Sequence, residues 1–235
     1  MRTLAESFQV LNRFKGFGEP KSALWFVGIE EGGEWSLEDL QSDLVELYAK
    51  PQPELDGRAN QKGKPHRTPV YPIASRVALG LFNPSRTFTS DDVRDFQHRK
   101  LGRWKSDTFL TNVYPLGKKS RTAWPEHYQL LGFKSAAACR ASVVEDRLAL
   151  LRELRQKHAP RLVVCHGEKD WDQFELCFGS SQAAWTTGLL PHNQKSIKWQ
   201  PGLVLSQFFA TQGGLMEHSN VAALIEVCKQ AILPR

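Results

Sequence analysis

The sequence predicts an α/β fold: a three-layer α/β/α sandwich around a central, mainly parallel four-stranded sheet, built as a single domain over residues 1–235. Apolar runs such as LWFVGI and LVLSQFF lack polar alternation, which is typical of parallel strands buried on both faces. Segments with helical periodicity separate these runs, and alternating strands and helices make a parallel sheet covered on both sides. No repeat, low-complexity tract or interdomain linker divides the chain.

In the first half of the chain the expected elements are a helix at 3–15, a strand at 23–29, a helix from Ser36 to about Tyr48, an exposed loop at 50–69, and helices at 73–81 and 91–101. Ser36 and Asp39 have the spacing of a capping box, which places the start of the second helix. Ser90 is the expected cap of the helix at 91–101. The loop at 50–69 is rich in Pro, Gly, Asn and Lys, and loops of that length are often functional.

In the second half the expected elements are a strand at 108–113, a long helix at 135–158, a strand at 161–165, a hairpin or edge strands near Trp185 and 196–199, a strand at 203–209, and a helix at 220–232. The last helix is amphipathic, because its apolar residues recur at helical spacing from Val221 to Ile232. It is therefore expected to pack on the sheet.

The charge of the chain favours a polyanionic partner. The net charge is +6 and the sequence pI is about 9.2, with the excess gathered in three segments. Clustered cations gain affinity by releasing counterions from phosphates, so we expect binding to nucleic acid, DNA above all, although a basic surface without a partner explains the charge as well. The candidate contacts are Arg58, Lys62, Lys64, Arg67, Lys118, Lys119 and Arg121, and a further basic group spans Arg94 to Lys105.

Several classes of protein are not supported by the sequence. No apolar run reaches the length of a membrane span, and MRTLAESFQV lacks the apolar core of a secretion signal, so a soluble, cytoplasmic protein with no membrane partner is expected. None of the four cysteines forms a CxxC pair, so neither zinc nor an iron–sulfur cluster is indicated. GKKS is not a P-loop and GIEEGG is not a dinucleotide motif. No metal or other cofactor is expected.

Polar residues follow each predicted strand where ligands bind in parallel sheets, beyond the carboxyl ends. These residues are Gly28 to Gly33, Asn112 to Pro115, His166 to Lys169, and Ser206 to Phe209. Taken singly, Asn112 and His166 are explained equally well by ordinary turn roles. Their shared location at one edge of the sheet favours a binding site.

The order of these segments resembles that of the uracil-DNA glycosylase superfamily. LWFVGIEEGG is similar to the first motif of that family, a strand followed by GINPG or GMNPG, with Gly28, Ile29 and Gly32 matching. TFLTNVYP is similar to the segment of the second strand, RLVVCHGEKDWDQF to that of the third, and LVLSQFFATQGGLMEHSN lies in the place of the fourth motif. The resemblance implies a glycosylase-like domain over the whole chain.

The resemblance also implies roles for individual residues. Glu30 stands where family members position the attacking water, and Asn112 where an Asn reads the pyrimidine edge. The departures are that Glu31 replaces a proline and that Ser206 to Phe209 stand where a catalytic His is usual. His218 is the nearest His and a candidate catalytic residue. Glu31 is also explained as a charge at the amino end of the following helix. Further candidate substrate contacts are Gly28, Ile29, Glu31, Gly32, Tyr114, Ser206 and Phe208.

Three functions remain open from the sequence. The first is a glycosylase that binds nucleic acid and hydrolyses the N-glycosidic bond of uracil or another deaminated or damaged base, with Glu30 and Asn112 as its main residues. Its leaving-group donor is His218, His166 or the backbone N–H groups of the glycine-rich loops. The second is an inactive glycosylase-fold module that binds nucleic acid or a modified nucleotide. The third is a different hydrolase or transferase, which a metal site among Glu30, Glu31, His166 and His218 would favour.

Overall fold

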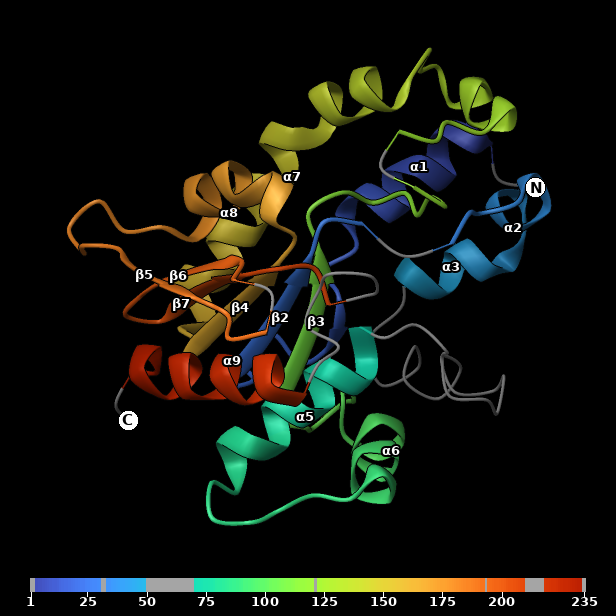
Figure 1. Ribbon diagram of the computed structural model, residues 1–235. Coiled ribbons are helices and arrows are strands. Elements are labelled where there is room, and N and C mark those ends of the chain that lie inside the picture. The colour runs from blue at the N-terminus through green and yellow to red at the C-terminus, as the bar shows by residue number, and fades with distance from the viewer. Residues whose placement is uncertain are drawn as a thin grey trace.

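The computed structural model describes residues 3–30, 33–49, 70–120, 122–192, 194–209 and 218–233 (Figure 1). It has an α/β architecture with a seven-stranded mixed sheet in the order β1-β3-β2-β4-β7-β6-β5. The strands are β1 (Phe17–Gly18), β2 (Leu24–Gly28), β3 (Thr108–Asn112), β4 (Leu162–His166), β5 (Thr186–Leu189), β6 (Ser196–Gln200) and β7 (Leu203–Ser206).

The parallel core of the sheet consists of β3, β2, β4 and β7, which are the four strands that the sequence predicts. The expected total of four strands is wrong. A two-residue strand, β1, adds antiparallel to β3, and the hairpin of β5 and β6 adds antiparallel to β7. The hairpin confirms the edge strands expected near Trp185 and 196–199. β1 was missed because two residues carry no readable period.

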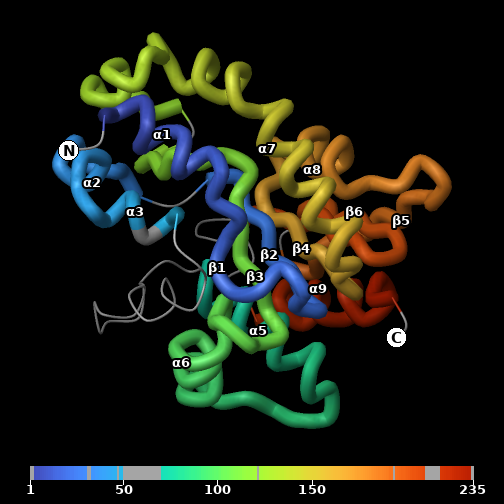
Figure 2. Tube along the Cα trace, turned by 180° about the vertical axis from the view of Figure 1, so that it is seen from behind, coloured from blue at the N-terminus to red at the C-terminus, as the bar shows by residue number. Residues whose placement is uncertain are grey.

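Helices lie on both sides of this sheet, as the two opposite views agree (Figures 1 and 2). Helices α1, α7 and α8 lie on one side, with α2, α3 and η1 beside α1, and α5, α6 and α9 lie on the other. Their bounds are α1 (Leu4–Arg13), α2 (Leu37–Gln41), α3 (Asp43–Ala49), α5 (Val70–Phe82), α6 (Ser90–Arg99), η1 (Glu126–Leu131), α7 (Ala136–His158), η2 (Glu168–Asp170), α8 (Trp171–Phe178) and α9 (His218–Ala231).

Two apolar clusters form the core, one on each face of the sheet. Along β2, Trp25 and Val27 belong to the cluster with α1, α7 and α8, whereas Leu24 and Phe26 belong to the cluster with α5 and α9. Successive side chains of a strand point to opposite faces, so the alternation follows from the pleat. It explains why the strand has no polar face and reads as an unbroken apolar run.

Capping explains where two of the helices begin. Ser36 and Asp39 form the expected capping box, but the helix ends at Gln41 and a second helix begins at Asp43, so the expected single helix to Tyr48 is wrong. The Ser42 hydroxyl donates to the Asp39 carbonyl oxygen and accepts from the Leu44 amide. Such bonds compete with helical ones. Ser42 therefore closes the first helix.

The cap of α6 is Thr89 and not the expected Ser90. The Thr89 hydroxyl accepts from the Asp92 amide at 3.2 Å, and an Asp92 carboxylate oxygen accepts from the Thr89 amide at 2.9 Å. This is a complete capping box. Thr and Ser are both common N-cap residues, and Thr89 is distinguished from Ser90 only by Asp92, which lies three positions after Thr89.

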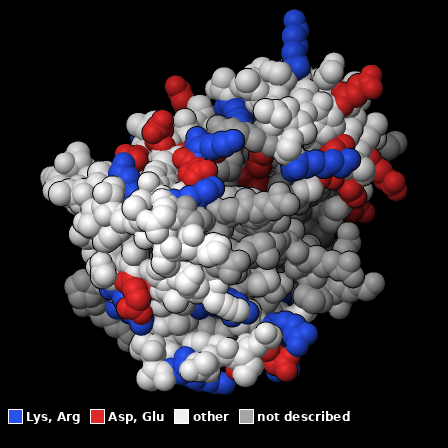
Figure 3. Space-filling view, in the orientation of Figure 1, with Lys and Arg blue, Asp and Glu red and all other residues white. Residues whose placement is uncertain are grey.

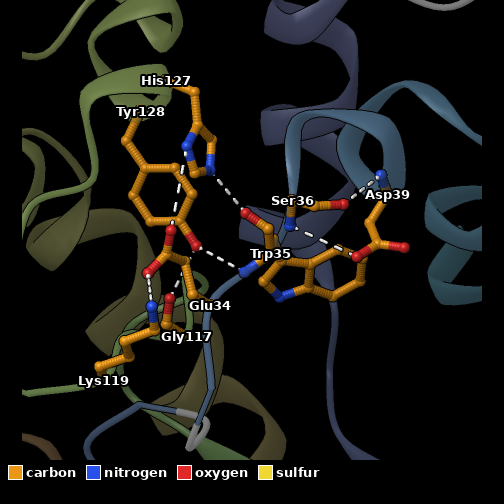
Figure 4. Close-up of polar contacts among 8 residues, drawn as sticks. All are labelled: Glu34, Trp35, Ser36, Asp39, Gly117, Lys119, His127 and Tyr128. Atoms are coloured by element: carbon orange, nitrogen blue, oxygen red, sulfur yellow. Dashed lines mark hydrogen bonds and ion pairs between the residues drawn. The ribbon is translucent and has the colours of Figure 1, made fainter.

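The loops that follow β2 and β3 are joined through η1 (Figure 4). The Tyr128 hydroxyl donates to the Gly117 carbonyl oxygen at 2.7 Å and accepts from the Trp35 amide at 2.9 Å. His127 Nε2 lies 2.7 Å from the Trp35 carbonyl oxygen. A buried tyrosine with both hydroxyl bonds made fixes the two loops relative to each other.

Within the described residues, no helix combines the length and the apolar character needed to cross a lipid bilayer.

Candidate functional site

A row of four residues crosses the carboxyl edge of the parallel core. Gly28 pairs with Asn112 on β3, and His166 pairs with Ser206 on β7. Gly28 and His166 come directly after the paired residues Val27 and Cys165, so they are at the same level. The row is therefore Asn112, Gly28, His166, Ser206. Its side chains lie on the face of Phe26 and Val164, two residues earlier on their strands, which is the face covered by α5 and α9.

Gly28 allows its two neighbours to approach each other. Asn112 Oδ1 and His166 Nε2 both lie within 3.2 Å of the point that a Cβ atom at residue 28 would occupy. Such a Cβ would overlap the Asn112 oxygen, so no side chain fits here without moving Asn112. The glycine thus brings an amide and an imidazole together from different strands.

His166 is held as a neutral, oriented ring. It is 6% exposed, and its ring stacks on that of Phe209 at 4.5 Å with an interplanar angle of 14°. Burial lowers the pKa of His166 to about 4, because the charged form loses its hydration. At pH 7 the ring therefore has one N–H donor and one acceptor nitrogen.

Two buried polar atoms of the row have no hydrogen-bond partner among the residues that the structure describes. They are His166 Nδ1 and Ser206 Oγ, on residues that are 6% and 0% exposed. Buried polar groups are nearly always paired with protein or water, so each unpaired one calls for a physical reason. A bound polar molecule at this edge would supply the missing partner.

The turn after β7 presents one aromatic ring outward and one inward. Phe208 is 46% exposed and its ring centroid lies 5.5 Å from that of His166, whereas Phe209 is fully buried. Gln207 Nε2 donates to the Ser196 carbonyl oxygen at 2.7 Å and so ties the turn to β6. Phe208 is thus an exposed flat surface next to the polar row.

Glu30 lies in an ion cluster two residues past the row. Its Oε2 atom is 3.1 Å from both Lys118 Nζ and Arg140 Nη2, and its side chain is 12% exposed. Arg140 is on the first turns of α7, and its guanidinium lies over the Tyr114 ring at 5.0 Å. Both cations pair with the same one of its two oxygens.

The residues expected to contact phosphate are placed differently from one another. Lys118 was predicted to contact phosphate, and it is 5% exposed and pairs with Glu30. Lys119 is exposed and lies 3.4 Å from Glu34 (Figure 4). The other predicted contacts, Arg58, Lys62, Lys64, Arg67 and Arg121, lie outside the described residues.

The predicted substrate-binding and catalytic residues also lie in different places in the fold. Gly28, Asn112 and Ser206 lie together in the row, with Phe208 beside it. Ile29 is buried and packs near Gly167, and Tyr114 is buried beneath Arg140. His218 is exposed at the start of α9, and none of the contacts in the described residues joins it to Glu30 or Asn112. Glu31 and Gly32 are outside the described residues.

On the face seen in Figure 3, Lys and Arg side chains are interspersed with Asp and Glu and form no continuous stripe. Several basic side chains of the 94–105 segment and its surroundings are paired: Arg99 with Asp95 at 2.7 Å, Arg94 with Asp91, and Arg86 with Asp92 at 2.7 Å. Both arginines of α6, Arg94 and Arg99, are thus paired with carboxylates of the same helix.

The described residues contain no group of three or more His, Cys, Asp or Glu side chains that is placed to hold a metal ion. The candidate metal set included Glu31, which lies outside those residues, so the third function is not decided by this observation.

The fold and the site define an α/β protein with a neutral polar row and an exposed aromatic ring at the carboxyl edge of its parallel strands. A comparison of the chain with protein-family models found no match, and a comparison with curated proteins found no significant one.

Sequence reasoning underestimated two residues. His166 was a candidate donor but not one of the preferred site residues, and the available signal was that the apolar runs LVVCH and LVLS both end in a polar residue, His166 and Ser206, which the register pairs. Arg140 was missed, because nothing in a helix of mixed charge shows which cation faces Glu30.

Proposed function

We propose that the protein is a DNA glycosylase-like protein that binds nucleic acid and hydrolyses the N-glycosidic bond of uracil or another deaminated or damaged base. The observation that carries the proposal is the row of Asn112, Gly28, His166 and Ser206 beside the exposed Phe208. An amide, an imidazole and a hydroxyl in one line match the alternating donors and acceptors of a base edge, and an aromatic face suits a base taken out of its stack. The two core clusters on opposite faces of the sheet support the three-layer sandwich that the family resemblance implies.

Hydrolysis forms a bond from the water oxygen to C1′ of the sugar and breaks the bond from C1′ to the base nitrogen, whose electron pair leaves with the base. The proton that the water loses is taken up by the departing base. In the proposed reaction Glu30 orients the water and stabilises the positive charge on the sugar, and Arg140 and Lys118 hold its carboxylate in place. A neutral His166 donates a hydrogen bond to the oxygen of the departing base.

His166 also accounts for the missing His of the fourth strand. The family resemblance places a catalytic His at the end of β7, where this chain has Ser206. His166 is the register partner of Ser206 on β4, one strand spacing of about 4.8 Å away. An imidazole is therefore available at the same level of the sheet, and we propose that it replaces His218 as the donor.

A second candidate function is supported by the ion cluster. One oxygen of Glu30 is shared by two cations at 3.1 Å, which weakens the carboxylate as a base for water. A protein with this arrangement can bind a base or modified nucleotide without cleaving it. The two functions share the recognition row and differ only in chemistry.

The test is a cleavage assay on single- and double-stranded oligonucleotides with one uracil, hypoxanthine or xanthine, followed by alkali to break abasic sites. Cleavage that falls at least ~100-fold in Glu30→Gln and in His166→Leu is expected for the enzyme. Glu168→Gln is the matched control, because Glu168 is a partly exposed carboxylate two residues from His166. No strand breaks together with base-specific binding would support the binding module, and neither cleavage nor binding at low salt would contradict both.

A further inference from the structure

We propose that Arg147 is a positioning residue that sets the orientation of Asn112 for base recognition. Arg147 lies on α7 and is 2% exposed. Its guanidinium donates four hydrogen bonds, all to backbone carbonyl oxygens: Nη2 to Asn112 at 2.6 Å, Nε to Val113 at 3.1 Å, and Nη1 to Asn12 and Phe14 at 2.7 Å each. The inference rests on the proposed function, because it needs Asn112 to be a recognition residue.

Burying the charged side chain of Arg147 costs free energy, which argues against a role that only fills space in the core. Within the described residues Arg147 forms no ion pair, and burial lowers its pKa to about 10, so it remains charged at pH 7. A buried cation without a carboxylate loses hydration that only hydrogen bonds offset. The four carbonyl oxygens provide that compensation, and a methionine in the same place would need none.

The geometry of the bonds explains what the cation does. Successive carbonyl groups of an extended strand point to opposite sides, yet the carbonyls of Asn112 and Val113 both accept from one planar guanidinium. The backbone must therefore turn at the end of β3, and the rigid fork holds that turn. Because the direction of the Asn112 side chain depends on this backbone, Arg147 controls how its amide lies beside Gly28.

The other two bonds connect this turn to the end of α1. Asn12 and Phe14 flank the last residue of α1, so the guanidinium links the helix end, the end of β3 and α7 at one point. The four carbonyl oxygens are bound by three different nitrogens of the guanidinium, and a lysine has a single nitrogen that cannot reach all of them. Arg147→Lys thus keeps the charge and removes the geometry.

The experiment measures base discrimination, defined as the ratio of Kd for an oligonucleotide with normal bases to Kd for the same oligonucleotide with one target base. A 2′-fluorinated target nucleotide slows cleavage and keeps the ligand intact. We expect wild type to discriminate by at least ~10-fold, and Arg147→Lys to lose most of this while Kd for the normal oligonucleotide changes by less than about 2-fold. Arg147→Gln, which keeps a planar donor, serves if the lysine variant does not fold.

Two controls separate positioning from loss of stability. Leu151→Ala removes a fully buried side chain one turn along α7, and it should be destabilised while keeping its discrimination. In the double variant Arg147→Lys/Asn112→Ala the discrimination should equal that of Asn112→Ala alone, because both changes act through one side chain. Normal discrimination in Arg147→Lys and Arg147→Gln would overturn the inference and leave the proposed function intact. A wild-type ratio of one would overturn both.

Discussion

At the residue scale, Gly28 is the position where the site tolerates least change. A Cβ added to Gly28 would lie 2.4 Å from Asn112 Oδ1 and 3.2 Å from His166 Nε2, so it would overlap the Asn112 oxygen. The restriction comes from the neighbours and not from the backbone, because Gly28 is not among the positive-φ glycines. A substitution of Gly28 therefore tests directly whether the side chains of Asn112 and His166 lie close together.

We expect Gly28→Ala to lower the free energy of unfolding by about 1–3 kcal/mol and to abolish base-specific binding, since Asn112 or His166 must move. Urea unfolding and the oligonucleotide binding ratio measure the two effects. Gly188→Ala on β5 is the control, because its added methyl group would meet the Trp199 ring at 3.2 Å and Ile197 at 3.7 Å, both on the neighbouring strand β6. Retained base discrimination in Gly28→Ala would contradict the assigned geometry.

His166 should make stability depend on pH. Its pKa is about 4 when folded and about 6.5 when unfolded, so between these values the unfolded chain binds more protons and the native state loses stability as pH falls. The loss is absent above pH 6.5 and complete below pH 4. From pH 7 to pH 5 it amounts to about 2 kcal/mol. Urea unfolding at the two pH values should show this difference in wild type and a smaller one in His166→Leu, because the lowered pKa of the partly buried His158 contributes in both proteins; equal slopes in both proteins would contradict the burial of a neutral ring.

At the scale of elements, hydrogen-bonded ends decide where the helices start. The box of Thr89 and Asp92 begins α6, and Ser90 is already its first residue. Thr89→Ala should lower the free energy of unfolding by about 1 kcal/mol, because it leaves the Asp92 amide without its acceptor. Ser90→Ala should stay within about 0.5 kcal/mol. Thermal or urea unfolding compares the two, and the reverse order would show that the cap is Ser90.

The sequence predicts the parallel core well, because the apolar runs of β2, β3, β4 and β7 are buried on both faces and carry a strong signal. It predicts the edges poorly: β1 has two residues, and β5 is mostly exposed. The polar ends of the strands were predictable, but their lateral order was not. That His166 stands beside Gly28, and that Lys118 is buried against Glu30, depends on strand register and loop packing between segments far apart in the chain.

At the scale of the whole molecule, the basic residues proposed to contact phosphates are distinct from the residues proposed to recognise the base. Lys119 is exposed, whereas Lys118 is buried in the ion cluster. If the basic segments contact phosphates, the plot of log Kd against log salt concentration should become shallower by about 1 in Lys119→Ala and by about 2 in Lys62→Ser/Lys64→Ser. Lys118→Met should leave the salt slope unchanged. A reduced slope in Lys118→Met would contradict its assignment to the site.

We propose that a nucleobase binds at the row beside His166. The most direct measurement is the NMR resonance of the His166 ring Cε1–H, assigned with His166→Gln, during titration with a short single-stranded oligonucleotide containing one 2′-fluorinated deoxyuridine. His158 is the internal reference, because it ends α7 on the opposite side of the sheet, before β4 begins. We predict a saturable shift of His166 that is absent with the matched thymidine oligonucleotide, while His158 does not move. An unchanged His166 resonance at saturating ligand, for uracil, hypoxanthine and xanthine alike, would contradict the account.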